Sequence, residues 1–309
     1  MLNNKMKGSK EACVRSSFNQ PVNLEYIEIT VIITTFERPD LLKTSLQSVL
    51  SQTTLPLEII IINDCSEANY QPVLLDFEQH NIKYLCLDKR SGANVARNIG
   101  VQAAKGNVIA FLDDDDVWLD IFLENHIQIY LDKPDVGAVV CGHKIMQTPS
   151  RINVNPEIYV SANELRHGNR FSGMSGFSAK TSVLRKYPFD PSLKNGQDWD
   201  LYVRLVQDQI KFINIPKSLF LYREDTPGSI SAKVITMQVS DVEERLQSSI
   251  KHRVWLGERF YKKRVSEQVL SLLSHKSNKL AWLRKSIELA GLLATIKTLK
   301  QQVMRKLKY

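Results

Sequence analysis

Residues 108–116 are VIAFLDDDD, an apolar run that ends in four consecutive aspartates. A short apolar run of this kind is typical of a buried strand. Four crowded carboxylates repel one another, and unpaired charges are costly to bury, so packing does not explain the aspartates. A divalent cation that carries a phosphate explains them, because hard cations take oxygen ligands and share them with phosphates. A solvated acidic turn is the alternative, and the rest of the chain decides between the two.

Apolar, β-branched segments alternate with segments of helical periodicity in the first half of the chain. Strands are predicted at 28–34, 57–62, 82–87, 107–112 and 137–141. Helices are predicted at 39–50, 70–79, 94–104 and 119–131. This alternation predicts an α/β fold with a mostly parallel, doubly wound sheet. Ligands of such sheets bind beyond the carboxyl ends of the strands, where Thr34, Asp64 and the aspartate run all lie.

The composition indicates a globular protein. The chain has 309 residues, of which 43% are hydrophobic and 24% are charged, so it holds one large domain or two smaller ones. The first 26 residues are polar, without the apolar segment of a signal peptide. We find no uninterrupted apolar stretch of about 18 residues that would predict a membrane-spanning helix. Four scattered cysteines without a CxxC pair argue against zinc and disulfides and favour a cytoplasmic protein.

The net charge of +8 is concentrated at the C-terminal end. Residues 251–309 contain 15 Lys+Arg against 3 Asp+Glu, whereas residues 1–250 contain 26 Lys+Arg against 30 Asp+Glu. The basic end therefore points to a partner of its own, such as an anionic membrane. Sparse aromatic residues among its charges argue against nucleic acid.

From Ile287 onward, apolar residues fall on one stripe of a predicted basic amphipathic helix. The stripe consists of Leu289, Leu292, Leu293, Ile296, Leu299, Val303 and Leu307. Such a helix is typical of a membrane-surface element. The alternative is a helix that packs on the rest of the chain or on a second subunit, with a solvated basic face.

Five segments carry motifs that occur together in one enzyme family. They are 31–39 (VIITTFERP), 62–66 (INDCS), 92–100 (GANVARNIG), 111–116 (FLDDDD) and 197–201 (QDWDL). Across roughly residues 27–230, the chain resembles a family 2 glycosyltransferase of the GT-A fold, of the type that builds bacterial O antigen or capsule. Each motif is weak alone, whereas the ordered set is specific.

The resemblance implies a division of the chain. It implies an N-terminal tail over 1–26, a GT-A catalytic domain over 27–234 and a basic helical region over 235–309. Within the catalytic domain, residues 27–145 would bind the nucleotide sugar and residues 146–234 the acceptor. The implied architecture is a Rossmann-like, mostly parallel sheet flanked by helices, with a C-terminal helical extension.

For the nucleotide, the resemblance implies contacts from Thr34, Phe36, Glu37 and Asp64. An aromatic ring can stack on a pyrimidine, and a carboxylate can accept a hydrogen bond from the imide N–H of uracil. A core position is the alternative for Phe36. Arg97 would lie near the donor diphosphate, since a guanidinium forms a fork of donors that suits phosphate. A surface salt bridge is the alternative for this arginine.

The aspartate run matches the DxD element of the family, which is Asp113-x-Asp115 here. The resemblance implies that Asp115 is the direct metal ligand and that Asp113 contacts the metal, its bound water or the ribose. A run of four aspartates leaves this register open by one residue, so Asp114 is counted among the nucleotide-sugar contacts. The metal would be Mn²⁺ or Mg²⁺, between which oxygen ligands do not discriminate.

The resemblance places the general base at Asp198, where relatives usually carry a Glu-Asp pair and this chain has Gln197-Asp198. Without the family context, an N-cap aspartate with no catalytic role would be the better interpretation. Trp199 is predicted either to stack on a sugar or to pack in the core, and Asp200 to be structural or to bind the acceptor.

A segment over 221–231 resembles the closing loop of the family, in which Arg223 would contact the diphosphate. Where relatives often have a metal-side His, this chain has Asp225. A carboxylate can serve as a metal ligand in its place.

Together these features predict an inverting, metal-dependent enzyme that transfers a sugar from a UDP-sugar to a glycan hydroxyl, with a lipid-linked acceptor in bacterial polysaccharide synthesis. The enzyme would be cytoplasmic and peripheral on the inner face of the cell membrane. One alternative is a haloacid-dehalogenase-like phosphohydrolase that uses Asp113 and Asp115, although that motif belongs after a first strand. The other is a non-catalytic glycan-binding protein. The absence of a GxGxxG turn after the first strand disfavours a dinucleotide dehydrogenase.

Overall fold

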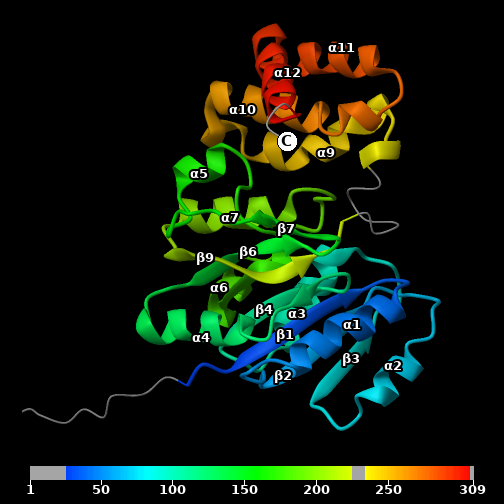
Figure 1. Cartoon of the computed structure of the whole chain (residues 1–309), viewed down its shortest axis with the longest axis vertical. Helices are drawn as coiled ribbons and strands as arrows, with labels where there is room; N and C mark the ends of the chain where they lie inside the picture. The colour runs from blue at the N-terminus through cyan, green and yellow to red at the C-terminus, as the bar shows by residue number, and fades with distance from the viewer. Residues whose placement is uncertain (1–25, 225–233, 307–309) are drawn as a thin grey trace, which may run out of the picture.

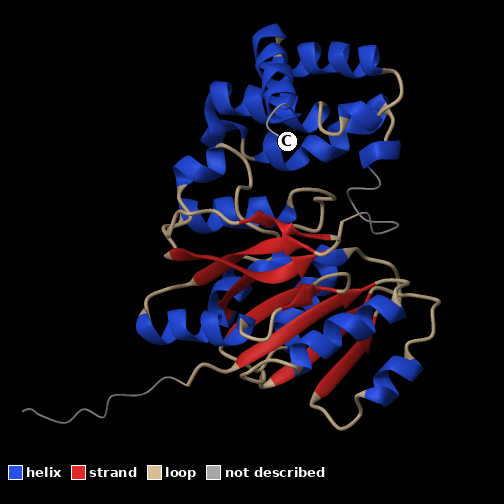
Figure 2. Cartoon of the chain, viewed as in Figure 1, coloured by secondary structure: helices blue, strands red, loops and turns tan. Residues whose placement is uncertain are grey.

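A mixed sheet forms the centre of the larger lobe, and helices cover both of its faces (Figures 1 and 2). The computed structural model describes residues 26–224 and 234–306. Within these residues the sheet has nine strands in the order β3-β2-β1-β4-β8-β6-β9-β5, and β7 pairs with β6. The strands are β1 Ile29–Thr35, β2 Glu58–Asn63, β3 Ile82–Cys86, β4 Val108–Asp113, β5 Val117–Trp118, β6 Ala138–Ile145, β7 Thr148–Asn153, β8 Phe177–Lys180 and β9 Phe212–Tyr222.

The first four strands are parallel, as the alternation of strand and helix patterns predicted. Thr34 of β1 lies opposite Asp113 of β4 in the register, so the polar ends of these two strands are neighbours. The helices of the larger lobe are α1 Pro39–Leu50, α2 Gln71–Asp76, α3 Ala93–Ala103, α4 Phe122–Asp132, α5 Ala162–Arg166, α6 Thr181–Lys186 and α7 Gln197–Gln207. The predicted doubly wound α/β arrangement is confirmed.

Successive residues of a strand point to opposite faces of the sheet, which gives the larger lobe two cores. Val31 and Ile33 of β1 pack in the core that contains residues of α1 and α4. Ile32 packs in the other core, with Ala96 of α3 and Leu201 of α7. Because β1 is covered on both sides, its sequence is apolar without alternation, which is typical of parallel strands.

The second half of the sheet is mixed, and the sequence analysis did not predict most of it. β8 is antiparallel to β4 and β6, whereas β9 runs parallel to β6. All residues of β7 are exposed, so this strand has no apolar signature. In β9 the exposed residues Pro216 and Lys217 interrupt the apolar run. The last strand of this half, β9, ends beside the aspartate run.

A smaller helical lobe follows, at the top of Figure 1. Its helices are α9 Val242–Lys251, α10 Arg253–Val269, α11 Lys279–Ala290 and α12 Leu292–Lys306. The lobe has its own core, in which Leu246, Val265 and Trp282 are buried. None of the helices in the described residues has the length and hydropathy needed to span a membrane.

The single amphipathic helix predicted from Ile287 onward is wrong. Gly291, at φ 86°, ends α11 and separates it from α12. Residues on either side of this glycine therefore do not share one helical stripe, and Leu307 lies outside the described residues. A left-handed φ is open to glycine because it has no Cβ.

Candidate active site

The four aspartates at the end of β4 divide into a buried pair and a half-exposed pair. Asp114 and Asp116 are buried, at 4% and 2% exposure. The side chains of Asp113 and Asp115 are 36% and 17% exposed. The chain turns directly after β4, where the backbone N–H of Asp116 donates to the carbonyl oxygen of Asp113 at 3.1 Å, and this turn divides the four side chains between the interior and the surface. The two aspartates of the predicted DxD element are thus the ones that remain accessible.

The buried pair is held by the protein itself. Asp114 accepts a hydrogen bond from Thr35 Oγ1 at 2.7 Å, and burial raises its pKa to about 7. Asp116 accepts from Ser175 Oγ at 2.5 Å and from the backbone N–H of Arg223 at 2.9 Å. Its pKa is raised well above the usual range, again mainly by burial. Asp114, which we expected among the nucleotide-sugar contacts, therefore points into the protein.

Two arginines reach the accessible carboxylates. Arg97, from α3, donates from Nη2 to Asp113 Oδ1 at 2.6 Å and is only 7% exposed. Arg38 lies 3.3 Å from a carboxylate oxygen of Asp114 and of Asp115. Arg97 was predicted from the sequence, whereas Arg38 was missed, although it stands before Pro39 in the first quoted motif. These cations offset part of the repulsion within the aspartate run.

The accessible pair suits a divalent cation. Asp113 and Asp115 offer carboxylate oxygens two residues apart, which Mg²⁺ and Mn²⁺ prefer. Among the described residues, no group of three or more His, Cys, Asp or Glu side chains is placed to enclose a metal. An ion held by one or two carboxylates and completed by substrate phosphates needs no such cage. Asp225, which stands at the metal-side position of relatives, lies outside the described residues.

The predicted nucleotide contacts lie on two adjacent loops. Both carboxylate oxygens of Asp64 accept backbone hydrogen bonds, from Ser91 at 2.7 Å and from Gly92 at 2.8 Å. Glu37 similarly accepts from the backbone N–H groups of residues 67 and 68, at 2.7 and 3.2 Å. These bonds give both acids a structural role and tie the loops that follow β1 and β2.

Phe36 is half-buried at the mouth of this region and is not part of the core. The guanidinium of Arg90 lies 4.1 Å from the centre of its ring. A cation over an aromatic face is a favourable arrangement. Arg90 was not singled out in the sequence, and we find no pattern there that would have marked it. The half-buried Thr34 completes this end of the site beside Asp113.

Asp198 lies at the start of α7. Its Oδ2 accepts from Asn169 Nδ2 at 2.6 Å, and its Oδ1 accepts from the backbone N–H of Trp199 at 2.8 Å. Burial raises its pKa, and these hydrogen bonds and the charges of Arg264 and Arg97 oppose that rise. Arg97 thus bonds Asp113 and also acts on Asp198. The accessible aspartates and the predicted base therefore converge on one side of the sheet.

Two predicted contacts of α7 are placed elsewhere. Trp199 is fully buried and donates from Nε1 to the carbonyl oxygen of Leu165 at 2.8 Å. Asp200 is also fully buried, with His252 Nε2 at 2.7 Å and Lys251 Nζ at 2.9 Å. Neither side chain can reach a sugar, so the core and structural interpretations of these two residues fit the structure. Arg223 remains half-buried beside the aspartates and donates from Nε to the carbonyl oxygen of Asp115 at 3.0 Å.

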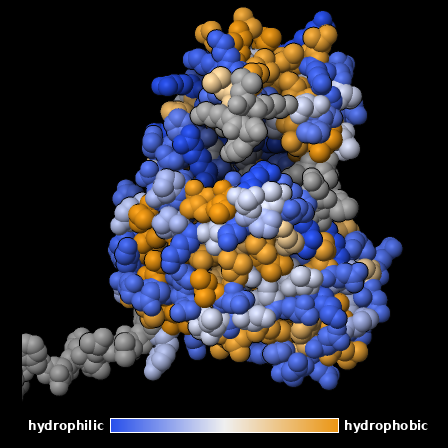
Figure 3. Space-filling view, viewed as in Figure 1, coloured by the Kyte–Doolittle hydropathy of each residue, from blue (hydrophilic) through white to orange (hydrophobic). Residues whose placement is uncertain are grey.

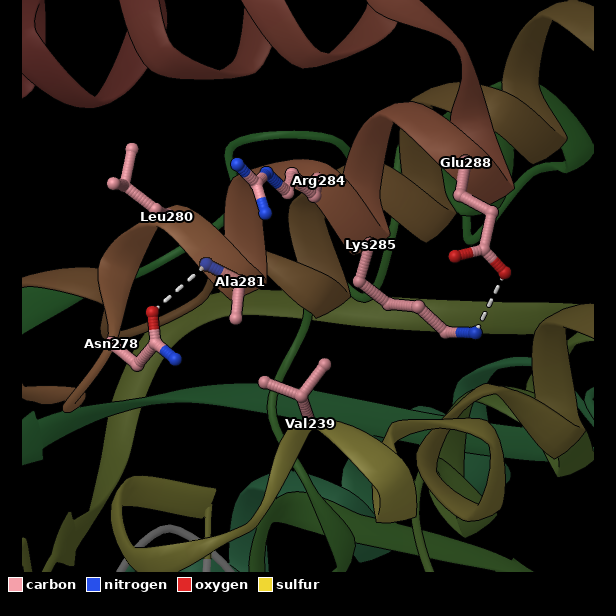
Figure 4. Close-up of a pocket in the computed structure, with 7 residues that line it drawn as sticks. All are labelled: Val239, Asn278, Leu280, Ala281, Arg284, Lys285 and Glu288. Atoms are coloured by element: carbon pink, nitrogen blue, oxygen red, sulfur yellow. Dashed lines mark hydrogen bonds and ion pairs between the residues drawn. The ribbon is translucent and has the colours of Figure 1, made fainter.

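A separate groove lies in the smaller lobe, between α11 and the turn at Val239 (Figure 4). Its volume is about 330 Å³. Asn278 caps α11 by accepting from the N–H of Ala281 at 3.2 Å, and Lys285 pairs with Glu288 at 2.8 Å. The groove contains none of the predicted site residues.

A doubly wound sheet with accessible aspartates at its edge and a carboxylate on a helix beyond it defines a GT-A glycosyltransferase. Residues 30–192 match the family model described as Glycosyl transferase family 2. The chain therefore belongs to glycosyl transferase family 2, and it is not a phosphohydrolase of the haloacid dehalogenase type.

Relatives and solved structures agree with this assignment. The Escherichia coli protein UDP-Glc:α-D-GlcNAc-diphosphoundecaprenol β-1,3-glucosyltransferase WfgD is 27% identical over 58% of this chain and 70% of its own. Staphylococcus aureus TarS 1–349 with UDP-GlcNAc gives a TM-score of 0.59 at 14% identity, over 85% of this chain and 71% of that one. The Pyrobaculum calidifontis mannosyltransferase PcManGT with GDP-Man and Mn²⁺ gives 0.56 at 16%, over 90% and 80%. These two structures support the GT-A fold.

Proposed function

We propose that this protein is an inverting, metal-dependent glycosyltransferase that moves a sugar from a UDP-sugar to a hydroxyl of a lipid-linked glycan during bacterial surface-polysaccharide synthesis. The observation that supports it most is the position of Arg97. Its guanidinium bonds Asp113 at 2.6 Å, and its charge lowers the pKa of Asp198. This contact and this charge effect support a diphosphate site and a base that lie close to each other.

In this proposal each residue has a chemical task. Asp115 and Asp113 would hold the divalent cation, which would supply positive charge to a departing diphosphate. Arg97 binds the same diphosphate from the α3 side, and Arg223 from the end of β9. Asp198 takes the proton of the acceptor hydroxyl. The hydroxyl oxygen then bonds to the anomeric carbon as the bond from that carbon to the diphosphate breaks, and the configuration inverts.

The donor and the acceptor are proposed from chemistry and likeness together. Glu37, Asp64 and Phe36 provide acids and an aromatic ring at the ends of β1 and β2, which suit a uracil base. TarS binds UDP-GlcNAc, and the name of WfgD specifies a UDP-sugar donor and a diphosphoundecaprenol acceptor. Both support a UDP-sugar donor and a lipid-linked acceptor here.

We further propose that the smaller lobe lies on the cytoplasmic face of an anionic membrane through α12. This helix buries polar residues, with Thr295 and Thr298 at 2% and 3% exposure. Its outer face carries the exposed apolar residues Leu292, Leu293, Ile296, Val303 and Met304. Figure 3 shows hydrophobic residues gathered at the far end of this lobe. With the exposed Lys297 and Lys300 beside them, these residues form a surface suited to an anionic bilayer.

The activity is tested by release of the nucleoside diphosphate and by transfer to glycan acceptors, with a panel of nucleotide sugars and with Mn²⁺, Mg²⁺ or chelator. We expect turnover with a UDP-sugar that stops when the metal is removed. Absence of metal-dependent turnover with every donor would contradict the proposal.

Membrane association is tested by co-flotation with vesicles of anionic or neutral lipid. Leu293→Glu, at a side chain with 75% exposure, should abolish binding to anionic vesicles. Leu55→Glu, at a similarly exposed leucine of the larger lobe (61%), is the matched control. Equal flotation of all three proteins would refute a role of α12.

A further inference from the structure

The smaller lobe reaches the catalytic base through one side chain, Arg264 of α10. Arg264 is 8% exposed and lies outside the segment matched by the family model. Its Nε donates to Ser249 Oγ at 3.0 Å, and its guanidinium carbon lies 3.5 Å from the centre of the Trp199 ring. These contacts fix the guanidinium plane against the start of α7, directly beside Asp198.

The two terminal nitrogens of Arg264 have no hydrogen-bond partner among the described residues. A Cβ placed on Gly168 would lie 3.5 Å from Nη1, and one placed on Gly196 would lie 3.9 Å from Nη2. Neither nitrogen is fully enclosed by protein, so both can reach solvent. Water can therefore fill these donors, and a ligand that accepts hydrogen bonds can take the place of that water.

The surroundings of Arg264 are predominantly basic. His167, next to Gly168, accepts from Lys263 Nζ at 3.1 Å. Burial lowers the pKa of His167, and the nearby charges of Lys263, Arg170 and Arg259 lower it further, against a smaller opposing effect of Glu164. His167 is therefore neutral and supplies no charge itself.

Other charged groups also act on Arg264. Burial lowers its pKa to about 10, while Asp198 and Glu267 oppose that change and Arg245 adds to it. Glu267 lies 3.6 Å from Lys263, and Glu164 lies 3.4 Å from Arg170, so both acids are shared with other cations. The cations at this junction outnumber the acids, which suits an anionic ligand.

Asp198 lies close enough to Arg264 for each charge to shift the pKa of the other. The charged atoms of the two side chains nevertheless lie more than 4.0 Å apart and form no ion pair in the described structure. Gly173 also leaves Asp198 open, because a Cβ there would lie 3.8 Å from Oδ2. Asp198 and Arg264 thus both lie against glycine backbone without forming an ion pair with each other. Figure 3 shows hydrophilic residues around the hollow between the two lobes.

We propose that Arg264, with Lys263 and Arg170 around it, forms an anion-binding subsite beside Asp198 that takes a phosphate or diphosphate group of the acceptor. The forked donors of arginine suit phosphate oxygens. Loop 167–170 connects the subsite to the base, because Asn169 in this loop donates to Asp198. The inference rests on the proposed function and adds the chemical class of the acceptor.

The test compares two acceptors with the same terminal sugar, one on an alkyl diphosphate and one on a neutral alkyl group, using the full chain. The wild-type protein should prefer the diphosphate acceptor. Arg264→Gln should raise the KM for that acceptor about 10- to 100-fold, the range expected for a charged hydrogen bond. Because the charge of Arg264 also acts on Asp198, kcat can fall with both acceptors, so the readout is the ratio of the two KM values, which should move toward one. Arg264→Lys should recover part of the preference.

Arg253→Gln is the matched control, because Arg253 is on the same helix and pairs only with Glu258 among the described acids, at 2.7 Å. It should behave as the wild type does. Equal preference for the two acceptors in the wild type, or an equal effect of Arg264→Gln on both, would overturn the inference. If Arg264→Gln does not fold, the same comparison is made with Arg264→Lys, in which an unchanged preference also overturns it.

Inorganic pyrophosphate and an alkyl diphosphate are added separately as competitors of the acceptor. Competition by either one, lost in Arg264→Gln, supports the subsite. Competition by pyrophosphate assigns it to a free anion, and competition by the alkyl diphosphate alone assigns it to a lipid-linked group. Competition by neither overturns it. Absence of transfer to both acceptors, with no donor hydrolysis, would instead contradict the proposed function.

Discussion

Asp198 and Asp200 lie two residues apart on α7, and we predict that their substitution by asparagine has opposite consequences. Asp198 is half-buried beside the cleft, whereas Asp200 is fully buried on the side of the helix that meets the smaller lobe. Asp198→Asn should remove activity and keep the fold. Asp200→Asn should destabilise the fold, and the protein that remains folded should keep its activity.

The magnitude for Asp198 follows from the role of base that we propose for it. Loss of a general base lowers kcat by roughly 10²- to 10⁴-fold, or about 3 to 5 kcal/mol in the activation barrier. The free energy of unfolding should not fall. Because burial raises the pKa of Asp198, its ionised form is less favourable in the fold than in the unfolded chain. At neutral pH a neutral asparagine relieves that cost.

The magnitude for Asp200 follows from its cations. Its carboxylate bonds His252 at 2.7 Å, Lys251 at 2.9 Å and Arg204 at 2.9 Å. Removal of one partner of a buried ion pair costs about 3 to 5 kcal/mol. Because Lys251 keeps 33% side-chain exposure and can be rehydrated, we expect the lower end, about 3 kcal/mol. For a chain of this size that corresponds to a fall in Tm of roughly 6 to 12 °C.

Urea unfolding followed by tryptophan fluorescence gives the stability, and release of the nucleoside diphosphate gives the activity. Asp135→Asn is the control, because Asp135 pairs with Lys211 on the surface, and it should change neither quantity. The reasoning is refuted if Asp198→Asn keeps more than about a tenth of kcat. It is also refuted if Asp200→Asn unfolds within about 1 kcal/mol of the wild type.

Three further outcomes are expected. The kcat/KM of the wild type should fall as the pH drops through the raised pKa of Asp198, because a base works only when it is ionised. The acidic limb of the pH profile should therefore lie above the usual carboxyl range. An acidic limb near pH 4 would contradict this. Asp115→Asn should remove stimulation by Mn²⁺ in a metal titration, and unchanged stimulation would assign the metal elsewhere. Gly176→Ala should lower the free energy of unfolding, measured in urea, by at least about 2 kcal/mol. The added Cβ would overlap Ser172 Oγ and lie 3.0 Å from the carbonyl oxygen of Cys141. A urea midpoint equal to that of the wild type would show that this segment can move.

The sequence predicted the parallel half of the sheet because β1, β2 and β4 are almost wholly buried and apolar and the helices between the strands are amphipathic. It did not predict β7, in which every residue is exposed, or β9, in which Pro216 and Lys217 interrupt the apolar run. The stripe from Ile287 failed for another reason. Its periodicity continues across Gly291, and only the left-handed φ of 86° shows that the helix ends there.

The site was predictable where it depends on topology. The aspartate run and Thr34 lie at strand ends, and parallel strands bring those ends together whatever the side chains do. Arg38 and Arg264 reach their partners through long side chains, from segments whose positions the pattern did not specify. The sequence did not decide whether Trp199 packs in the core or stacks on a sugar. Periodicity does not tell which face of a helix a second lobe will cover.

Helix α7 is where the two lobes become one functional unit. Its apolar side chains, such as Leu201, pack into the core of the larger lobe. Trp199 and Asp200 are covered by side chains of the smaller lobe, namely Arg264 and His252. The position of Asp198 between these faces is therefore fixed by contacts from both lobes. If Asp198 is the base, as we propose, a change in α9 or α10 should alter catalysis through α7 while the ends of β1 to β4 stay as they are.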